Sequence, residues 1–74
     1  METYKILKYE ICKRGYSQIY VVNSMNFLDP SLNMTASKLS SILLGKRKLS
    51  GNEFIALCKV LNLDIDSFTP YDEN

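Results

Sequence analysis

The sequence predicts one small all-α domain spanning residues 1–74, and three observations lead to that class. Apolar residues recur every three or four positions along most of the chain, which is the spacing of one face of a helix. Serine and threonine precede these stretches as N-caps, whereas glycine and asparagine follow them as left-handed ends. A chain of this length has room for a single hydrophobic core. The expected helices are residues 3–14, 17–27, 35–44, 50–61 and 64–68, followed by an acidic tail at 69–74.

The first expected helix has an apolar stripe along one side. Tyr4, Leu7 and Ile11 share this face, and Cys12 lies beside it. The charged residues fall elsewhere on the helix, where we expect them to face solvent. Gly15 follows and can adopt the left-handed conformation that closes a helix without a Cβ penalty.

The second expected helix begins after Ser17, a plausible N-cap. Its β-branched residues would also suit a strand. The cap and the preceding glycine favour a helix, because both are usual signals at helix boundaries. The inward stripe is expected to be Ile19, Val22 and Met25, with Phe27 as a further candidate.

The third expected helix is capped by Thr35 and closed by Gly45. Its inward positions are Leu39, Ile42 and Leu43, which recur at the spacing of one helical face. The remaining side chains are small or basic and are expected to face outward.

The fourth expected helix begins after Ser50 and ends at Asn62, a residue that tolerates the left-handed conformation. Asp64 can then cap a last short helix. The buried stripe of the fourth helix is expected to be Phe54, Leu57, Cys58 and Leu61, and that of the last helix Ile65 and Phe68.

Charge is divided along the chain, although the net charge is only +1. Residues 35–52 contain four basic and no acidic side chains, whereas residues 53–74 contain five acidic side chains and one basic one. Lys46, Arg47 and Lys48 stand together directly after the glycine stop, with no acid near them. We therefore expect one side of the molecule to bind phosphate groups. The alternative is that the three basic residues belong to a turn that only faces solvent.

The composition argues against catalysis, metal binding and membrane insertion. The chain has no histidine, so a cysteine or serine nucleophile would lack a ready base. Its two cysteines are too few for a zinc site, and we expect both Cys12 and Cys58 to be buried small hydrophobes rather than a disulfide. Neither a signal peptide nor a membrane span is apparent, so a cytoplasmic location is expected.

An ordered set of residues resembles a known DNA-binding family. The set is Ser37-Lys38-Leu39-Ser40, Gly45-Lys46-Arg47, Ser50, Leu57, Leu61-Asn62-Leu63-Asp64-Ile65 and Phe68, together with Gly15-Tyr16-Ser17-Gln18. This pattern resembles the helix-turn-helix domain of the phage repressor/Cro type, also called XRE-like. The resemblance implies a compact five-helix domain of the lambda-repressor-like fold, with the third helix as the recognition helix.

The chain departs from this family between its second and third helices. Residues 28–34 make the turn about seven residues longer than the usual three or four. Asp29, Pro30 and Ser31 are a turn signal, because proline cannot continue a helix and aspartate can bond the backbone ahead. We expect the apolar residues of this insertion to fold back onto the core. The widened turn either still presents the third helix to DNA or forms a surface for a protein partner.

The resemblance implies a set of DNA contacts. The base-reading positions of the family fall on Ala36, Ser37 and Ser41, whose small side chains make no bidentate contact and so predict weak direct readout. Four neutralised phosphates, counting Lys38 and the three basic loop residues, predict a salt slope near −3.6 at about 0.9 per phosphate. The expected contacts are Gln18, Thr35, Ala36, Ser37, Lys38, Ser41, Lys46, Arg47, Lys48 and Asn52, with Arg14 as a further phosphate contact.

The function implied by the resemblance is a small DNA-binding transcriptional regulator of a phage lysogeny switch or a similar mobile-element circuit. The family typically binds near-palindromic operator DNA as a homodimer. No cofactor, metal ion or small-molecule substrate is expected. The alternative is an antirepressor of the same fold, which binds a phage repressor protein and blocks its DNA binding. Low net charge, small residues at the reading positions and the inserted turn favour this alternative.

Overall fold

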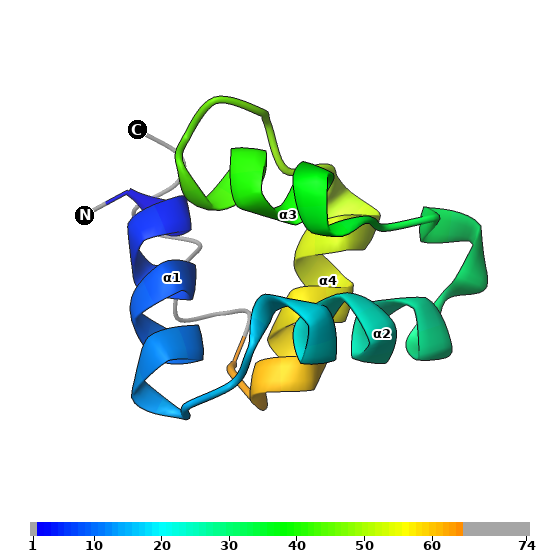
Figure 1. Ribbon diagram of the computed structural model, residues 1–74, viewed down its shortest axis with the longest axis horizontal. Helices are drawn as coiled ribbons and strands as arrows, with labels where there is room; N and C mark the ends of the chain where they lie inside the picture. Colours follow the sequence, from blue (N-terminus) through cyan, green and yellow to red (C-terminus); the bar gives the residue numbers. More distant parts are fainter. Residues whose placement is uncertain (1, 65–74) are drawn as a thin grey trace.

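The computed structural model describes residues 2–64, and this part of the chain is all-helical (Figure 1). Its elements are α1 (Thr3–Lys13), α2 (Gln18–Leu28), a short 3₁₀ helix η1 (Pro30–Leu32), α3 (Ala36–Leu43) and α4 (Gly51–Leu61). Residues 2–64 thus contain four α-helices, at the places expected for the first four, rather than five. The expected fifth helix at 64–68 and the tail at 69–74 lie, apart from Asp64, outside the described residues.

Three of the four expected N-caps are confirmed, and the helix that the fourth, Asp64, would cap lies outside the described residues. The hydroxyl oxygens of Ser17, Thr35 and Ser50 each accept the backbone N–H three residues ahead, at 3.0, 3.1 and 3.2 Å respectively. Each bond satisfies one of the N–H groups that the first turn of a helix leaves without a partner. These caps fix where α2, α3 and α4 begin.

The expected left-handed stops are also confirmed. Gly15, Gly45 and Asn62 have φ angles of 72°, 77° and 55° at the ends of α1, α3 and α4. Asn33, in the turn before α3, is left-handed as well (φ 49°) and was not anticipated. Asparagine tolerates this conformation better than other residues that carry a Cβ atom.

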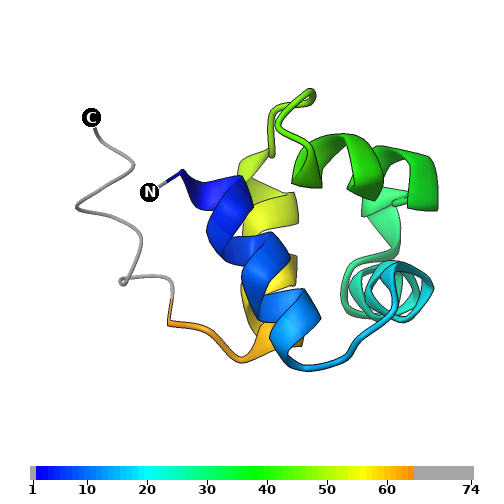
Figure 2. The same cartoon turned by 60° about the vertical axis from the view of Figure 1, so that its left-hand side comes forward.

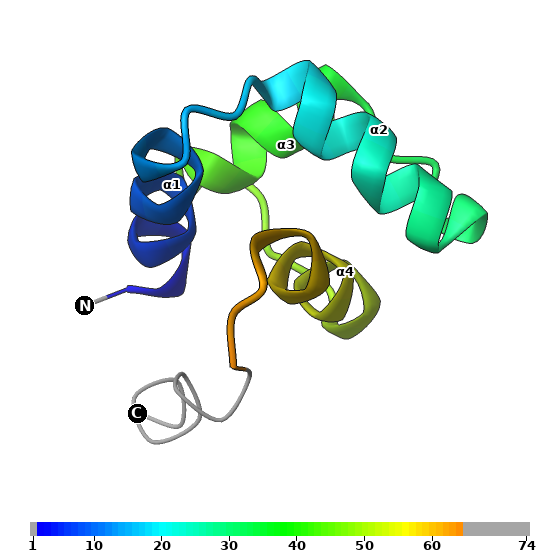
Figure 3. The same ribbon diagram turned by 90° about the horizontal axis from the view of Figure 1, so that it is seen from below.

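The core lies where α2 packs against α3 and α4 and where α1 packs against the same two helices. Seen from below, α1 lies to the left of α4 and α2 lies above it, with α3 between α1 and α2 in the view (Figure 3). The inward stripe of α3 is confirmed in full, and Phe54 on α4 is only half-buried. The buried apolar residues are Leu7, Ile11, Val21, Val22, Met25, Met34, Leu39, Ile42, Leu43, Ala56, Leu57, Cys58 and Leu61.

The expected stripe of α2 is wrong at two positions. Ile19 and Phe27 are 58% and 86% exposed, and Val21 is buried instead. At about 100° per residue, Phe27 lies roughly 200° around the helix from the buried Met25. Because α2 is apolar on nearly every side, its sequence does not reveal which side faces the core.

The two cysteines differ, although both were expected to be buried. Cys58 is buried in α4, whereas Cys12 is exposed on α1, and both are free thiols. Cys12 directly follows the buried Ile11, and one residue along a helix turns the side chain by about 100°. The position beside the stripe therefore faces solvent.

This difference predicts selective thiol chemistry. Burial raises the pKa of the Cys58 thiol, which lowers the fraction of reactive thiolate at any pH below that pKa. A disulfide reagent at neutral pH should label Cys12 in the native protein and Cys58 only as fast as the protein opens. Mass spectrometry of digested, labelled protein measures both rates. Equal labelling of the two thiols would contradict this placement.

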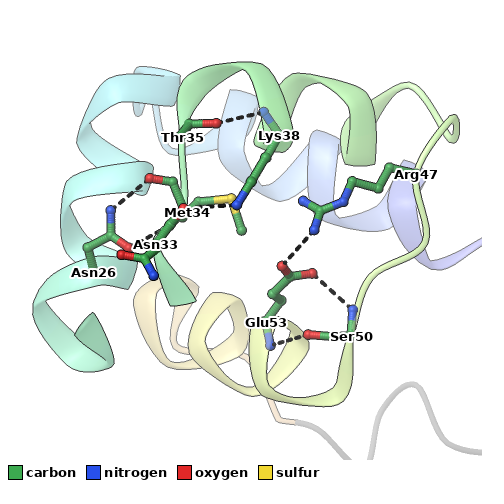
Figure 4. A network of polar contacts seen from close by, with 8 residues as sticks. All are labelled: Asn26, Asn33, Met34, Thr35, Lys38, Arg47, Ser50 and Glu53. Atoms are coloured by element: carbon green, nitrogen blue, oxygen red, sulfur yellow. Dashed lines mark hydrogen bonds and ion pairs between the residues drawn. The ribbon is translucent and has the colours of Figure 1, made fainter. Parts of the chain in front are cut away.

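The long turn between α2 and α3 is held by one side-chain amide. The Asn26 amide donates to the Met34 carbonyl at 2.9 Å, and its oxygen accepts the Met34 N–H at 2.8 Å (Figure 4). Asp29 caps η1 by accepting the Ser31 N–H at 3.1 Å. Met34 is buried as expected and Leu32 packs against the core, but Leu28 remains 47% exposed.

Removing this amide should loosen the turn. Asn26→Ala leaves two partly buried backbone groups of Met34 without a partner, which should lower the free energy of unfolding by about 1–2 kcal/mol. Asn23→Ala, at an exposed position of the same helix, is the matched control and should change stability little. Urea unfolding followed by circular dichroism measures both. Equal effects of the two variants would show that the clamp is not needed.

Candidate nucleic-acid interface

Helix α3 lies at the edge of the molecule with one face turned outward (Figure 1). Ala36 and Ser37 are exposed and Ser41 is half-buried, while the opposite face of the helix is in the core. Thr35 is exposed, but its hydroxyl oxygen is engaged as the N-cap. The outer face of α3 therefore presents small side chains.

Lys38 is directed back towards the turn. Its ammonium group donates to the carbonyl of the left-handed Asn33 at 3.2 Å, and the side chain is half-buried (Figure 4). This contact ties the first turn of α3 to the insertion. The ammonium group has three N–H donors, so this bond leaves two of them for other partners.

The segment of residues 44–49, here called the basic loop, follows α3 and stands beside it at the top of the molecule (Figure 2). The N–H groups of Gly45 and Lys46 donate to the carbonyls of Ile42 and Ser41 at 3.0 and 2.9 Å. This is the paired bonding of a glycine-closed helix end. The side chains of Lys46, Arg47 and Lys48 are all exposed, in the loop that follows the C-terminal end of α3.

The first turn of α1 packs against the start of the basic loop. A Cβ atom added to Gly45 would lie 2.6 Å from Cζ of Tyr4, so the ring of Tyr4 lies against the glycine. Thr3, Tyr4 and Ile42 line a hollow of about 370 Å³ together with residues 45–49. Sequence reasoning missed this contact, and the glycine was its only local signal.

The middle of the basic loop is paired with an acid from α4. Arg47 Nη2 lies 3.5 Å from Oε2 of Glu53, whose residue is only 5% exposed (Figure 4). The other carboxylate oxygen of Glu53 accepts the Ser50 N–H at 3.0 Å. The expectation that no acidic residue lies near the three basic residues is therefore wrong, because Glu53 lies close to Arg47 in the folded protein.

The other expected contacts lie away from the basic loop. Gln18 is exposed at the first position of α2. Asn52 lines a separate hollow with Leu28 and Asp29, at the side of the inserted turn. Arg14 pairs with Glu10 within α1. The structure thus brings together the outer face of α3 and the basic loop, and not the whole set.

A second surface is apolar and was not foreseen. A groove of about 410 Å³ lies between α2 and the C-terminal half of α4, lined by Tyr20, Asn23, Ser24, Phe27, Leu28, Lys59 and Val60. Phe27 and Tyr20 are 86% and 50% exposed there. Exposed aromatic residues around a groove are typical of protein interfaces.

Comparison with protein-family models, with curated proteins and with solved structures gives no match. Among residues 2–64 no cluster of acidic, cysteine or histidine side chains is suited to a metal ion. In the same part of the chain, none of the helices has the length and apolar character needed to cross a bilayer.

Proposed function

We propose that this protein is a small DNA-binding transcriptional regulator of the phage repressor/Cro type, with a lambda-repressor-like arrangement of its helices. In this proposal α3 enters the major groove and the basic loop lies along the phosphate backbone. The observation that carries it is that exposed small residues lie on α3 and that the loop directly after this helix exposes the side chains of Lys46 and Lys48. Small residues let a helix approach the bases closely, and the adjacent lysines supply charge for the backbone.

The chemistry of this surface favours affinity over sequence discrimination. Ser37 can bond to several base edges and Ala36 can touch a thymine methyl group, but neither makes a bidentate contact. Lys46 and Lys48 neutralise phosphates, and each contributes about 0.9 to the salt slope. Sequence preference would then come from DNA shape and from binding a near-palindromic operator as a homodimer.

A second candidate function is an antirepressor that binds a phage repressor protein. The apolar groove between α2 and α4 favours it, because Phe27 lies there almost fully exposed on a chain with a net charge of only +1. This groove is lined by residues other than those of α3 and the basic loop. Variants of the two surfaces therefore distinguish the two functions.

The deciding experiment is a titration of labelled DNA from the protein's own locus, with and without the neighbouring repressor. A specific shift by this protein alone, lost as salt is raised, is the result expected for a DNA-binding regulator. Absence of that shift, together with loss of the repressor's own shift, would overturn it in favour of the antirepressor. Phe27→Asp should leave DNA binding intact and abolish binding to the repressor protein.

A further inference from the structure

Glu53 is the one charged residue that is buried within residues 2–64. Its backbone N–H donates to the Ser50 hydroxyl and its Oε1 accepts the Ser50 N–H, which completes a capping box at the start of α4. Its Oε2 faces Arg47. One carboxylate therefore joins the start of α4 to the middle of the basic loop (Figure 4).

The pairing divides the three basic residues into two kinds. The charge of Arg47 is balanced by Glu53, so the pair as a unit carries no net charge to offer a phosphate. Neither Lys46 nor Lys48 has an ion-pair partner among residues 2–64, and both are exposed. Of the three basic residues of the loop, only these two lysines can neutralise phosphates without first breaking an ion pair.

The basic loop is also fixed at both of its ends. The carbonyl of Ser41 and the ring of Tyr4 hold its start, and the capping box holds its exit into α4. Between these ends, the Arg47 backbone N–H also donates to the Ser41 carbonyl at 3.3 Å and Leu49 packs against the core. The Arg47–Glu53 contact is the attachment that a charged side chain makes at the middle. A loop held at three places loses little conformational freedom when it meets a partner.

We propose that Glu53 is a positioning residue for nucleic-acid binding, which anchors the basic loop through Arg47 so that Lys46 and Lys48 face the phosphates. Arg47 is then an anchor and not a phosphate ligand. This inference rests on the proposed DNA-binding function, because it assigns the roles of three side chains at the same surface.

The first test uses the free protein and needs no DNA. Glu53→Gln keeps an oxygen that can accept the Ser50 N–H but removes the charge that holds Arg47. Amide hydrogen exchange of the basic loop should become at least about tenfold faster, while the amides of α2 keep their protection. Unchanged exchange in the loop would show that Glu53 anchors nothing and would overturn the inference.

The second test measures the salt dependence of binding to a short mixed-sequence DNA duplex by fluorescence anisotropy. Lys46→Gln and Lys48→Gln should each lower the salt slope by about 0.9. Arg47→Gln combined with Glu53→Gln removes one charge of each sign and leaves the net charge unchanged. This double variant should bind more weakly than the wild type, because the anchor of the loop is lost. Its salt slope should stay at the wild-type value, because both lysines remain. A slope lowered by about 0.9 would identify Arg47 as a phosphate ligand and overturn the inference.

The matched control is Lys13→Gln, which removes a lysine from the far end of α1, about 14 Å along the helix from Tyr4. It should leave the slope unchanged. If the wild-type protein binds no duplex, the proposed function fails and the assignment of the lysines to phosphate fails with it. Faster exchange of the loop in Glu53→Gln would still show that the carboxylate anchors it.

Discussion

Replacing Lys46 and Lys48 together by glutamate should weaken binding to duplex DNA by about 100-fold at low salt and reduce the salt slope by about 1.8. The two lysines are exposed, lie in the loop directly after α3 and have no ion-pair partner among residues 2–64. Glutamate at these positions would repel the phosphates that lysine attracts. Arg47 is left in place, because glutamate there would set a second carboxylate against the buried Glu53.

The control for this variant carries the same change in net charge elsewhere. Lys8→Glu with Lys13→Glu reverses two exposed lysines of α1 that belong to its solvated side. Fluorescence anisotropy with the same DNA should show only a small loss for this second pair. Equal losses for the two pairs would mean that overall charge, and not the basic loop, governs the interaction.

Substituting alanine for Gly45 should lower the free energy of unfolding by about 2–4 kcal/mol. The residue has a φ of 77°, which costs about 1 kcal/mol for a residue with a Cβ atom. The new methyl group would also lie 2.6 Å from Cζ of Tyr4, so the ring must move out of its place against the loop. In a domain of this size, each kcal/mol corresponds to a fall in Tm of about 4–8 °C.

Gly15→Ala separates the two causes. Gly15 has nearly the same φ, 72°, but an added Cβ atom would have no other atom within 4 Å. Thermal unfolding should therefore show a loss of only about 1 kcal/mol for Gly15→Ala. Similar losses in the free energy of unfolding for both variants would mean that the Tyr4 ring can move aside without a free-energy cost. The additional destabilisation by Gly45→Ala, relative to Gly15→Ala, should disappear when Gly45→Ala is made in a protein in which Tyr4 is already replaced by alanine.

Much of the secondary structure was predictable because its signals are local. The caps at Ser17, Thr35 and Ser50 bond a backbone group three residues ahead, and the stops at Gly15 and Gly45 depend on the residue's own backbone. Such interactions involve neighbours in the chain, so residue types in order are enough to indicate them. The inward stripes of α3 and α4 followed from periodicity, because polar residues mark their outer sides.

The orientation of α2 and the environment of the basic loop were not predictable in the same way. A helix that is apolar on most sides can turn several faces inward, and the helices packed around it decide which one is buried. Phe27 and Ile19 were therefore misplaced. The three basic residues appeared equivalent in sequence, yet Glu53 pairs with Arg47 alone.

By itself, the sequence determined the all-α class of residues 2–64, the starts of helices α2 to α4, the ends of α3 and α4, and the outward face of α3. The tertiary structure alone decided that Tyr4 supports Gly45, that Asn26 clamps a turn eight residues ahead, and that Glu53 takes one of three basic side chains. The difference is one of range. Capping and helical periodicity are set by neighbouring residues, whereas these three contacts exist only after separate elements have packed together.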